Sequence, residues 1–316
     1  MIRYRRILFR VLMLGIAVAV TAGLSNLTGS AAAEGESRIR DGRIAFIRCE
    51  SLCGAPGSRP DIYTMARDGS ALRRLTRTRS WERSPDWSPS GRRLVYGCGG
   101  TRRDSGNLCR MRADGSHRVP LTEGEFEDSS PDWGQGDRIV FIRTTATGSG
   151  PLYMYQLVTI ASDGTDERIL IEGFGRISDP HWSPDGSAIV YAQSDAAQSD
   201  IHVIASDGSD PRNLTGTTQH ETDPAWAPDG ERIAFSRYVD SRWHIFLTDP
   251  SGESESRVTS RKGGLGIEWA PSGRRLLLLR LTNNLHPLFS MHLGNRSTVR
   301  LTGGYDTGAP SWKAAL

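Results

Sequence analysis

The stretch DPAWAPDG, residues 223–230, places two prolines, a tryptophan and an Asp-Gly pair within eight residues, directly before the apolar run ERIAFS (231–236). Similar stretches recur along the chain: SPDWSPSG (84–91), SPDWGQGD (130–137), DPHWSPDG (179–186), GIEWAPSG (266–273) and the shorter APSW (309–312). Their tryptophans, Trp87, Trp133, Trp182, Trp226, Trp269 and Trp312, are 46, 49, 44, 43 and 43 residues apart. A period in the forties is typical of a propeller blade or of an α-solenoid.

The content of each period decides between these two architectures. Each of the first five stretches is followed by a β-rich run such as RIVFIR (138–143), then by a polar loop, a second run such as DIHVIA (201–206), a Gly-bearing turn and a short tail such as RNLT. Short apolar runs separated by Gly, Pro, Asp and Ser are typical of strands and hairpins. Each repeat therefore predicts a four-stranded antiparallel sheet.

The recurring stretch fits the innermost strand of such a sheet. A proline there removes one ladder hydrogen bond, which is tolerable at an edge that faces a central channel. The tryptophan can lie between neighbouring sheets and bury roughly 200 Å². The Asp-Gly or Ser-Gly pair then supplies the turn into the second strand. We therefore predict a structural role for all six tryptophans.

The two ends of the repeat region predict how the sheets close. RIAFIR (43–48) is a second strand without a tryptophan stretch before it, and GAPSW (308–312) is a tryptophan stretch without a second strand after it. If both belong to one sheet, the tail completes the blade that the head begins, and the ring leaves no long free edge. We predict an all-β fold: a six-bladed β-propeller over residues 43–316, after a signal peptide (1–33) and a short tail (34–42).

The repeat resembles that of TolB-type β-propellers. The resemblance is carried by Pro180-Trp182-Ser183-Pro184-Asp185-Gly186, by Pro224-Trp226-Ala227-Pro228-Asp229-Gly230 with Ile233 and Phe235, and by Asp61-Ile62-Tyr63, Asp68-Gly69 and Leu75-Thr76. It covers nearly all of residues 43–312 and implies the propeller fold. It does not imply one function, because such repeats occur in TolB, ahead of serine-peptidase domains, in oligosaccharide lyases and in other exported proteins. TolB has an α/β domain before its propeller, which we do not expect here, so the resemblance does not extend to a role in the Tol-Pal system.

The N-terminus predicts export. Four arginines within residues 3–10 precede the apolar run VLMLGIAVAVTAGL (11–24) and an Ala-Ala-Ala cleavage site at 31–33; an uncleaved membrane anchor is the alternative, although the run is short for a bilayer span. We expect an exported protein, either periplasmic or otherwise in the cell envelope or extracellular. Without residues 1–33 the charge is 35 − 36 = −1, so nucleic-acid binding loses its electrostatic basis. We expect a monomer.

The four cysteines lie within one part of the chain. Cys98 ends one strand-like run and Cys109 lies in the next, while Cys49 and Cys53 flank a loop. In an exported protein we expect two disulfides, Cys98–Cys109 and Cys49–Cys53. A zinc site is the alternative, but no His or Cys at zinc spacing lies nearby.

Candidate binding residues lie where the loops enter the inner strands, at the mouth of the channel. Counting five and six residues back from each tryptophan gives a mixed polar ring: Trp81, Glu82, Glu127, Asp128, Arg176, His220, Glu221 and Asp306. Such a ring predicts recognition of a protein or peptide in the bacterial cell envelope. A divalent cation at the mouth is an alternative left open, and we otherwise expect no cofactor and no metal.

Enzyme chemistry has less support in the sequence. No G-x-S-x-G is present, and the six predicted blades use the chain, so we expect no α/β-hydrolase domain. Only His220 and His181 are expected near the channel, too few for the metal centre of the related lyases. We therefore predict a non-enzymatic binding module without catalytic residues; the alternative is a lyase-like carbohydrate-active enzyme or sugar binder, and a third is a scaffold that binds elsewhere.

Overall fold

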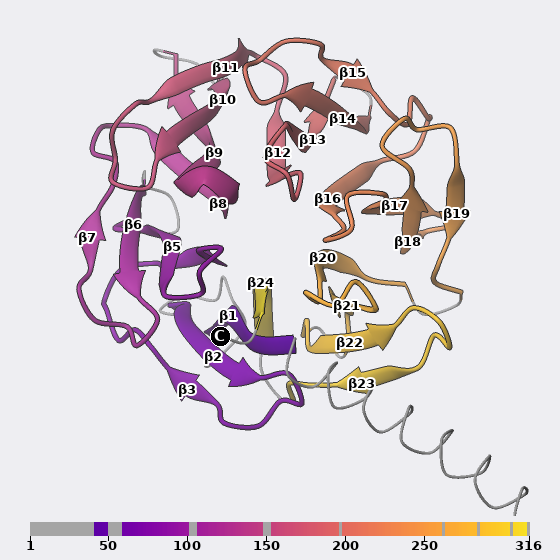
Figure 1. Ribbon diagram of the computed structural model, residues 1–316, viewed down its shortest axis with the longest axis horizontal. Coiled ribbons are helices and arrows are strands. Elements are labelled where there is room, and N and C mark those ends of the chain that lie inside the picture. The colour runs from indigo at the N-terminus through magenta and orange to yellow at the C-terminus, as the bar shows by residue number, and fades with distance from the viewer. Residues whose placement is uncertain are drawn as a thin grey trace, which may run out of the picture. The chain divides into compact units, whose positions relative to one another are not determined.

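Six tryptophan-bearing strands stand around a central axis, each as the innermost strand of its own sheet (Figure 1). The computed structural model describes residues 41–49, 59–100, 106–147, 153–195, 198–260, 263–282, 285–303 and 306–314. Each sheet has four antiparallel strands, so the predicted six-bladed β-propeller is confirmed. The predicted signal (1–33) lies outside the described residues and stays a prediction.

The blades follow one another along the chain, and the strands of each blade are named in order from the innermost to the outermost. Blade 1 contains β24 (Asp306–Ala314), β1 (Asp41–Cys49), β2 (Asp61–Ala66) and β3 (Arg73–Arg74). Blade 2 contains β4 (Arg83–Trp87), β5 (Arg93–Cys98), β6 (Asn107–Arg112) and β7 (Val119–Pro120). Blade 3 contains β8 (Glu127–Trp133), β9 (Arg138–Ala146), β10 (Tyr153–Ala161) and β11 (Arg168–Gly173), with the short 3-10 helix η1 (Gln135–Asp137) between β8 and β9.

The second half of the ring repeats this order. Blade 4 contains β12 (Ile177–Trp182), β13 (Ala188–Ser194), β14 (Ser199–Ala205) and β15 (Arg212–Asn213). Blade 5 contains β16 (Glu221–Trp226), β17 (Ile233–Val239), β18 (Arg242–Thr248) and β19 (Glu255–Arg257). Blade 6 contains β20 (Leu265–Trp269), β21 (Arg275–Leu279), β22 (Leu288–His292) and β23 (Thr298–Arg300).

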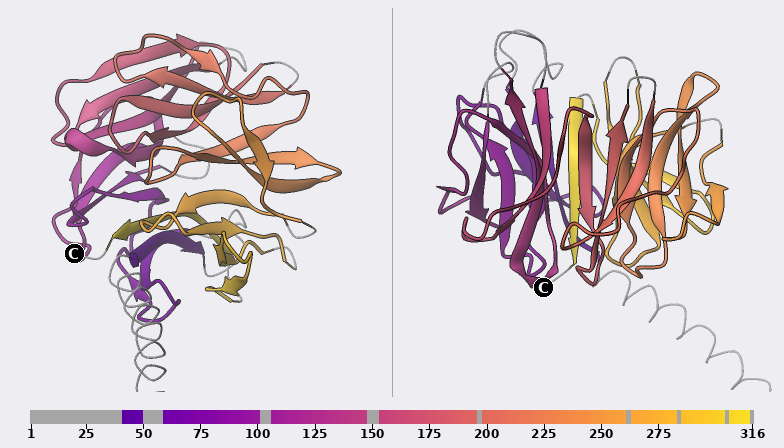
Figure 2. Two further views of the ribbon diagram at one scale, coloured as in Figure 1. Left: turned by 45° about the vertical axis from the view of Figure 1, so that its right-hand side comes forward. Right: turned by 90° about the horizontal axis from the view of Figure 1, so that it is seen from above.

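The ring has two faces, which the strands connect (Figure 2). The turn face carries the Trp-Ser-Pro type turns between first and second strands, residues 88–92, 134–137, 183–187, 227–232 and 270–274. The loop face carries the connections between second and third strands, together with those that enter the inner strands, such as residues 75–82, 121–126, 174–176 and 214–220. The channel mouth of the sequence analysis lies on the loop face.

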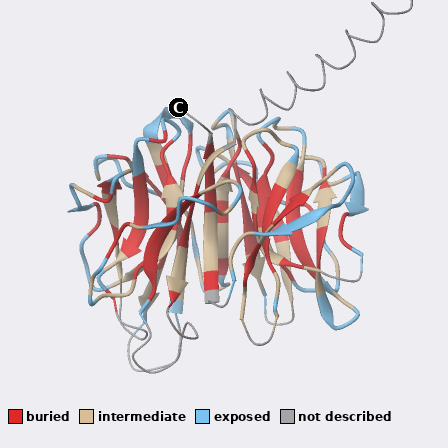
Figure 3. Cartoon of the chain, turned by 90° about the horizontal axis from the view of Figure 1, so that it is seen from below, coloured by how far each residue is buried: buried red, intermediate tan, exposed pale blue. Residues whose placement is uncertain are grey.

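Each tryptophan lies between two blades. All six indole rings are at most 8% exposed, and each belongs to a different apolar cluster built from two neighbouring blades. Trp133 of blade 3, for example, packs with Val95 and Leu108 of blade 2. The core is therefore divided into six inter-blade layers, which Figure 3 shows as buried segments within the sheets.

The ring closes where the tail pairs with the head. β24 is antiparallel to β1, with Trp312 opposite Ile44. On the blade 2 side, Lys313 donates from Nζ to the carbonyl of Gly91 at 2.8 Å, and its ammonium lies 4.7 Å from the centre of the Trp87 ring. Closure thus rests on a strand pair and on contacts to the following blade.

One predicted disulfide is confirmed. Cys98 and Cys109 are bonded across the β5–β6 hairpin, with 5.8 Å between their Cα atoms. Cys53, the predicted partner of Cys49, lies outside the described residues, so that second bridge stays a prediction.

The seam between head and tail generates a stability prediction. Replacing Trp312 by Ala removes a buried indole from the last inter-blade layer and should lower the free energy of unfolding by about 3–5 kcal/mol, measured by urea denaturation. Trp81→Ala is the matched control, because this half-buried indole on the loop face belongs to none of the six clusters. Equal losses for the two variants would contradict the proposed importance of the seam.

Candidate functional site

Every inner strand contains a bulge and turns polar side chains into the channel. The strand register shifts once in five of the six innermost pairs and twice in the pair of β1 and β24. The third residue before each tryptophan has a positive φ of 43–63°: Ser84, Ser130, Asp179, Asp223, Gly266 and Ala309. Residues three and one before the tryptophan lie on the same side of an extended strand, and both line the channel in five of the six inner strands; in β16 Asp223 lines it and Ala225 does not.

The residue directly before each tryptophan binds the next blade. Asp86 accepts a hydrogen bond from the backbone N–H of Trp133 at 2.6 Å, and Asp132 accepts one from Trp182 at 2.8 Å. His181 Nδ1 lies 3.4 Å from the N–H of Trp226. The side chains therefore connect consecutive inner strands, and we call this arrangement the channel belt.

The channel belt continues across the seam. The backbone N–H of Trp312 is bonded to Glu268. Ser311 accepts from the N–H of Trp87 at 3.2 Å and donates to Asp86 at 2.6 Å. In blade 5 the corresponding residue is Ala225, whose backbone carbonyl accepts from the indole N–H of Trp269 at 3.0 Å instead. Side chains thus supply five of the six links of the belt: Asp86, Asp132, His181, Glu268 and Ser311.

Crowded acids raise one another's pKa in this channel. Burial, followed by the charge of Asp132, raises the pKa of Asp86 to about 7. Burial, followed by the charge of Asp179, raises the pKa of Asp223 to about 7. Burial also raises the pKa of Glu268 well above its usual value. The His181 Nε2 atom lies 3.6 Å from Asp132 and 4.0 Å from Glu268.

Space in the channel is small. Its middle encloses about 130 Å³, and its end at the turn face about 250 Å³. Across the described ranges, no group of three or more His, Cys, Asp or Glu side chains is arranged to hold a metal ion. The belt acids bind backbone amides of the protein itself, so their geometry is explained by the links between blades.

Three of the predicted mouth residues are buried on the loop face. Glu82, Asp128 and Glu221 are at most 2% exposed. Each lies six residues after the threonine of a blade's Leu-Thr tail, and hydrogen bonds join these threonines to the acids. The structure therefore places these carboxylates in the interior rather than at an accessible mouth.

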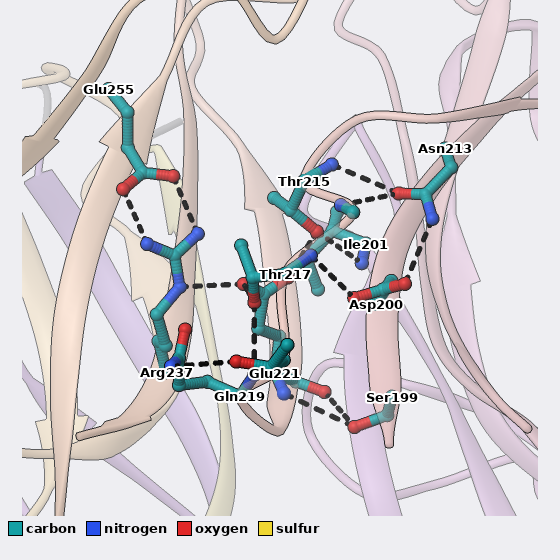
Figure 4. Close-up of polar contacts among 12 residues, drawn as sticks. Ser199, Asp200, Ile201, Asn213, Thr215, Thr217, Gln219, Glu221, Arg237 and Glu255 are labelled. Carbon is teal, nitrogen blue, oxygen red and sulfur yellow. Dashed lines mark hydrogen bonds and ion pairs between the residues drawn. The ribbon is translucent and has the colours of Figure 1, made fainter. Parts of the chain in front are cut away.

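Figure 4 shows this arrangement around Glu221. Arg237 donates from Nε to Glu221 at 2.6 Å, and its Nη2 donates to Glu255 at 2.6 Å. Thr217 donates to the same Glu221 at 3.0 Å. Burial raises the pKa of Glu221 although these partners act in the opposite direction. We call such a threonine, acid and arginine group a blade clasp.

Blade 3 has an equivalent blade clasp. Arg143 donates from Nε and Nη2 to Asp128 at 2.8 and 3.1 Å, and from Nη1 to Glu167 at 2.6 Å. Blade 2 lacks the arginine, and Glu82 accepts from Thr78 at 3.0 Å as well as from Thr76. The six-residue spacing from threonine to acid was visible in the sequence and is the signal that could have identified these clasps.

The remaining predicted residues lie at or near the surface of the loop face, where the structure brings only some of them together. Glu127 pairs with Arg83 at 2.6 Å, and the Arg83 guanidinium lies 5.5 Å from the Trp81 ring centre. Glu127 and Arg176 line a common hollow of about 500 Å³ between blades 3 and 4. His220 is exposed and lies apart from this hollow. Asp306 begins β24, but its side chain is outside the described part.

The loop face also carries apolar groups that the sequence analysis did not identify. Four large apolar side chains there are 41–69% exposed: Tyr153, Phe174, Tyr238 and Leu281. The other exposed large apolar residues, Leu72, Val119, Ile169 and Val299, lie on or beside the outermost strands. A second hollow of about 850 Å³ opens on this face between blades 5 and 6, lined by Tyr238, Trp243 and Phe289 among others.

Comparison with protein families agrees with this architecture. The model described as "TolB beta propeller domain" matches residues 157–314, half of the chain. The chain belongs to the TolB β-propeller family. Two sequence relatives are an uncharacterised protein of Agrobacterium fabrum, 30% identical over 149 residues (45% of this chain and 50% of the relative), and a protein TolB homolog of Chlorobium luteolum, 28% identical over 134 residues (42% and 29%). The chain thus spans half or less of the length of these curated relatives.

Among solved structures, TolB from Acinetobacter baumannii superposes with a TM-score of 0.72 at 16% identity, covering 86% of this chain and 66% of that one. At this identity the likeness concerns the fold. Within the described stretches, no helix reaches the length and apolarity that a bilayer crossing requires.

The channel acids generate a pH prediction. The pKa of Asp223 is about 7 in the folded protein and near 3.8 in the unfolded chain. Between these values the folded protein binds the proton and the unfolded chain does not, so the free energy of unfolding falls as the pH rises from about 4 to about 7. Asp223→Asn removes this charge and should raise that free energy by about 1–3 kcal/mol at pH 8, with little change at pH 5.

Urea denaturation at both pH values measures this effect. Asp185→Asn is the control, because hydrogen bonds from Ser183 and Ser187 lower the pKa of this turn-face carboxyl, and its loss should not stabilise the protein at pH 8. A pH-independent effect of Asp223→Asn would contradict the ionisation argument.

Proposed function

We propose that this chain is an exported, non-enzymatic binding module that recognises a protein or peptide with its loop face. The observation that carries the proposal is the position of the exposed apolar side chains. Tyr153, Phe174, Tyr238 and Leu281 all belong to this face, and exposed aromatic residues beside hollows are typical of protein interaction sites.

The polar groups of the same face support recognition rather than catalysis. Glu127 and Arg176 provide opposite charges around the hollow between blades 3 and 4, which suits the polar rim of a protein interface. The acids deeper in the fold already bind partners in the blade clasps and the channel belt. These acids stabilise the ring. The accessible polar groups of the loop face are the ones that a partner can contact.

Export is part of this proposal. The Cys98–Cys109 bridge joins two strands of one hairpin, and such disulfides persist mainly in oxidising compartments outside the cytosol. Together with the predicted signal at residues 1–33, the bridge supports a location in the periplasm, cell envelope or extracellular space.

Paired substitutions in and beside β11 test the binding face. Phe174→Ser removes a side chain that is 67% exposed on the loop face, whereas Ile169→Ser removes one that is 50% exposed on the outermost strand of the same blade. With the purified chain as bait in a cell-envelope extract, and then with the recovered partner in a titration, Phe174→Ser should weaken binding about tenfold or more. Ile169→Ser should bind like the unchanged protein.

Both variants must retain the unfolding midpoint of the unchanged protein. Equal binding by Phe174→Ser and Ile169→Ser would exclude the loop face as the site of recognition.

A further inference from the structure

The larger loop-face hollow, between blades 5 and 6, has mainly apolar walls, and none of the described residues that line it is acidic. Its volume is about 850 Å³. Its lining includes the aromatic residues Tyr238, Trp243 and Phe289 and the basic residues Arg242 and Arg280. The Tyr238 and Trp243 rings pack together with 5.3 Å between their centres. The hollow between blades 3 and 4, in contrast, includes Glu125, Glu127 and Asp179.

Arg280 occupies the position of the clasp arginine in blade 6. In blade 5, Arg237 lies four residues after Ile233, which pairs with Trp226. In blade 6, Arg280 lies four residues after Leu276, which pairs with Trp269. Repeat symmetry therefore places Arg280 where Arg237 binds two carboxylates.

Both of those carboxylates are replaced in blade 6. Glu221 lies five residues before Trp226, and the residue five before Trp269 is Gly264. Glu255 pairs with Thr248 across β18 and β19, and the corresponding pair across β22 and β23 is Thr298 with Met291. Blade 6 thus retains the arginine of a blade clasp and lacks both acids.

The backbone explains why glycine stands where the first acid would be. Gly264 donates its N–H to the carbonyl of Trp243 at 3.1 Å. A Cβ atom at Gly263 would lie 1.4 Å from that carbonyl oxygen, and one at Gly264 would lie 2.7 Å from Leu278 Cδ1. The close approach to blade 5 requires glycine at position 263, whereas a side chain at Gly264 would have to displace Leu278 of blade 6 itself.

Among the described residues, Arg280 has only neutral partners. Its Nε donates to the carbonyl of Gly263 at 3.1 Å and its Nη1 to Thr298 Oγ1 at 3.4 Å. The guanidinium lies 5.0 Å from the Phe289 ring centre, and in the described ranges it forms no ion pair. Burial lowers its pKa, whereas the carboxylates beside Arg143 and Arg237 outweigh burial and raise theirs.

We propose that this hollow binds the C-terminal residue of a partner polypeptide that ends in an aromatic side chain. The terminal carboxylate pairs with Arg280 in place of the missing clasp acids, because a guanidinium offers several N–H donors in a geometry that matches a carboxylate. The aromatic ring packs against Tyr238, Trp243 and Phe289, which bury it from water. This inference rests on the proposed function and names the chemistry that one part of the loop face recognises.

Three probes and four proteins test the inference. The probes are acetyl-Gly-Gly-Phe with a free carboxylate, the same peptide as its C-terminal amide, and acetyl-Gly-Gly-Ser with a free carboxylate. The proteins are the full chain, Arg280→Gln, Thr298→Glu and Thr298→Gln. Thr298 lies on the exposed strand β23, so its substitutions keep the fold testable if Arg280→Gln fails to fold. Calorimetric titration gives the dissociation constants.

The full chain should bind the free phenylalanine peptide at least tenfold more tightly than its amide and than the serine peptide. Arg280→Gln should bind the acid and the amide equally. Thr298→Glu should bind the acid at least fivefold more weakly than Thr298→Gln, because the glutamate supplies the partner that Glu255 gives to Arg237, whereas the glutamine matches its size without the charge. Equal binding of acid and amide by the full chain, or equal binding of the acid by Thr298→Glu and Thr298→Gln, would overturn the inference.

Partner capture separates this inference from the proposed function. If the peptides fail to bind while Phe174→Ser still weakens capture of the envelope partner, the loop face is retained as a binding face and the hollow is not its carboxylate site. If the acid peptide binds through Arg280 while capture is insensitive to Phe174→Ser, the hollow is retained as a carboxylate site. The proposal that the wider loop face captures the envelope partner is then excluded.

Discussion

The backbone N–H of each blade tryptophan has to find an acceptor in the interior, and this requirement organises the rest of the ring. The indole fills the layer between two blades, so its own peptide group lies at the inner edge, away from bulk water. An unpaired buried N–H costs about 1–3 kcal/mol. For five of the six tryptophans the preceding blade supplies the acceptor from the side chain of the residue just before its own tryptophan, as Asp86 does for Trp133.

The use of side chains as acceptors for these N–H groups places several acids along the axis of the channel. Asp86, Asp132 and Glu268 each stabilise a neighbour's amide; burial raises the pKa of all three, and the charges of neighbouring acids raise the pKa of Asp86 and Glu268 further. His181 and Ser311 perform the same task without a negative charge. The mixture of side chains in the channel belt therefore limits the repulsion while keeping five links. An acidic channel in this protein is first a consequence of how the blades are joined.

The blade clasps also give buried polar groups hydrogen-bond partners, at the loop-face end of the inner strands. A buried acid is stabilised there by a threonine and, in blades 3 and 5, by an arginine that also reaches an outer acid. Blade 6 departs from the pattern because its entering segment passes directly over Trp243. A local requirement of the backbone thus removes an internal partner and leaves a basic group beside an apolar hollow.

The fold was predictable from the sequence, whereas the site was predictable only in part. Blade number and ring closure could be inferred because they depend on local properties of the sequence. These are the tryptophan period, the β-rich content and the unmatched first and last strands. Glu82, Asp128 and Glu221 were placed at the mouth because sequence distance from the tryptophan does not reveal burial. The channel acids were missed because the sequence repeat does not show that the inner strands turn the residues before each tryptophan toward the axis.

Pairing of β24 with β1 has a consequence for the order of events during synthesis. A ribosome delivers the chain from its N-terminal side, so three strands of blade 1 are made long before β24 supplies the fourth. Until then Trp87 lacks the Ser311 acceptor, and the inner edge of β1 is unpaired. Without β24 the ring is an open arc whose two ends each leave an inter-blade surface uncovered, and pairing of β24 with β1 closes it.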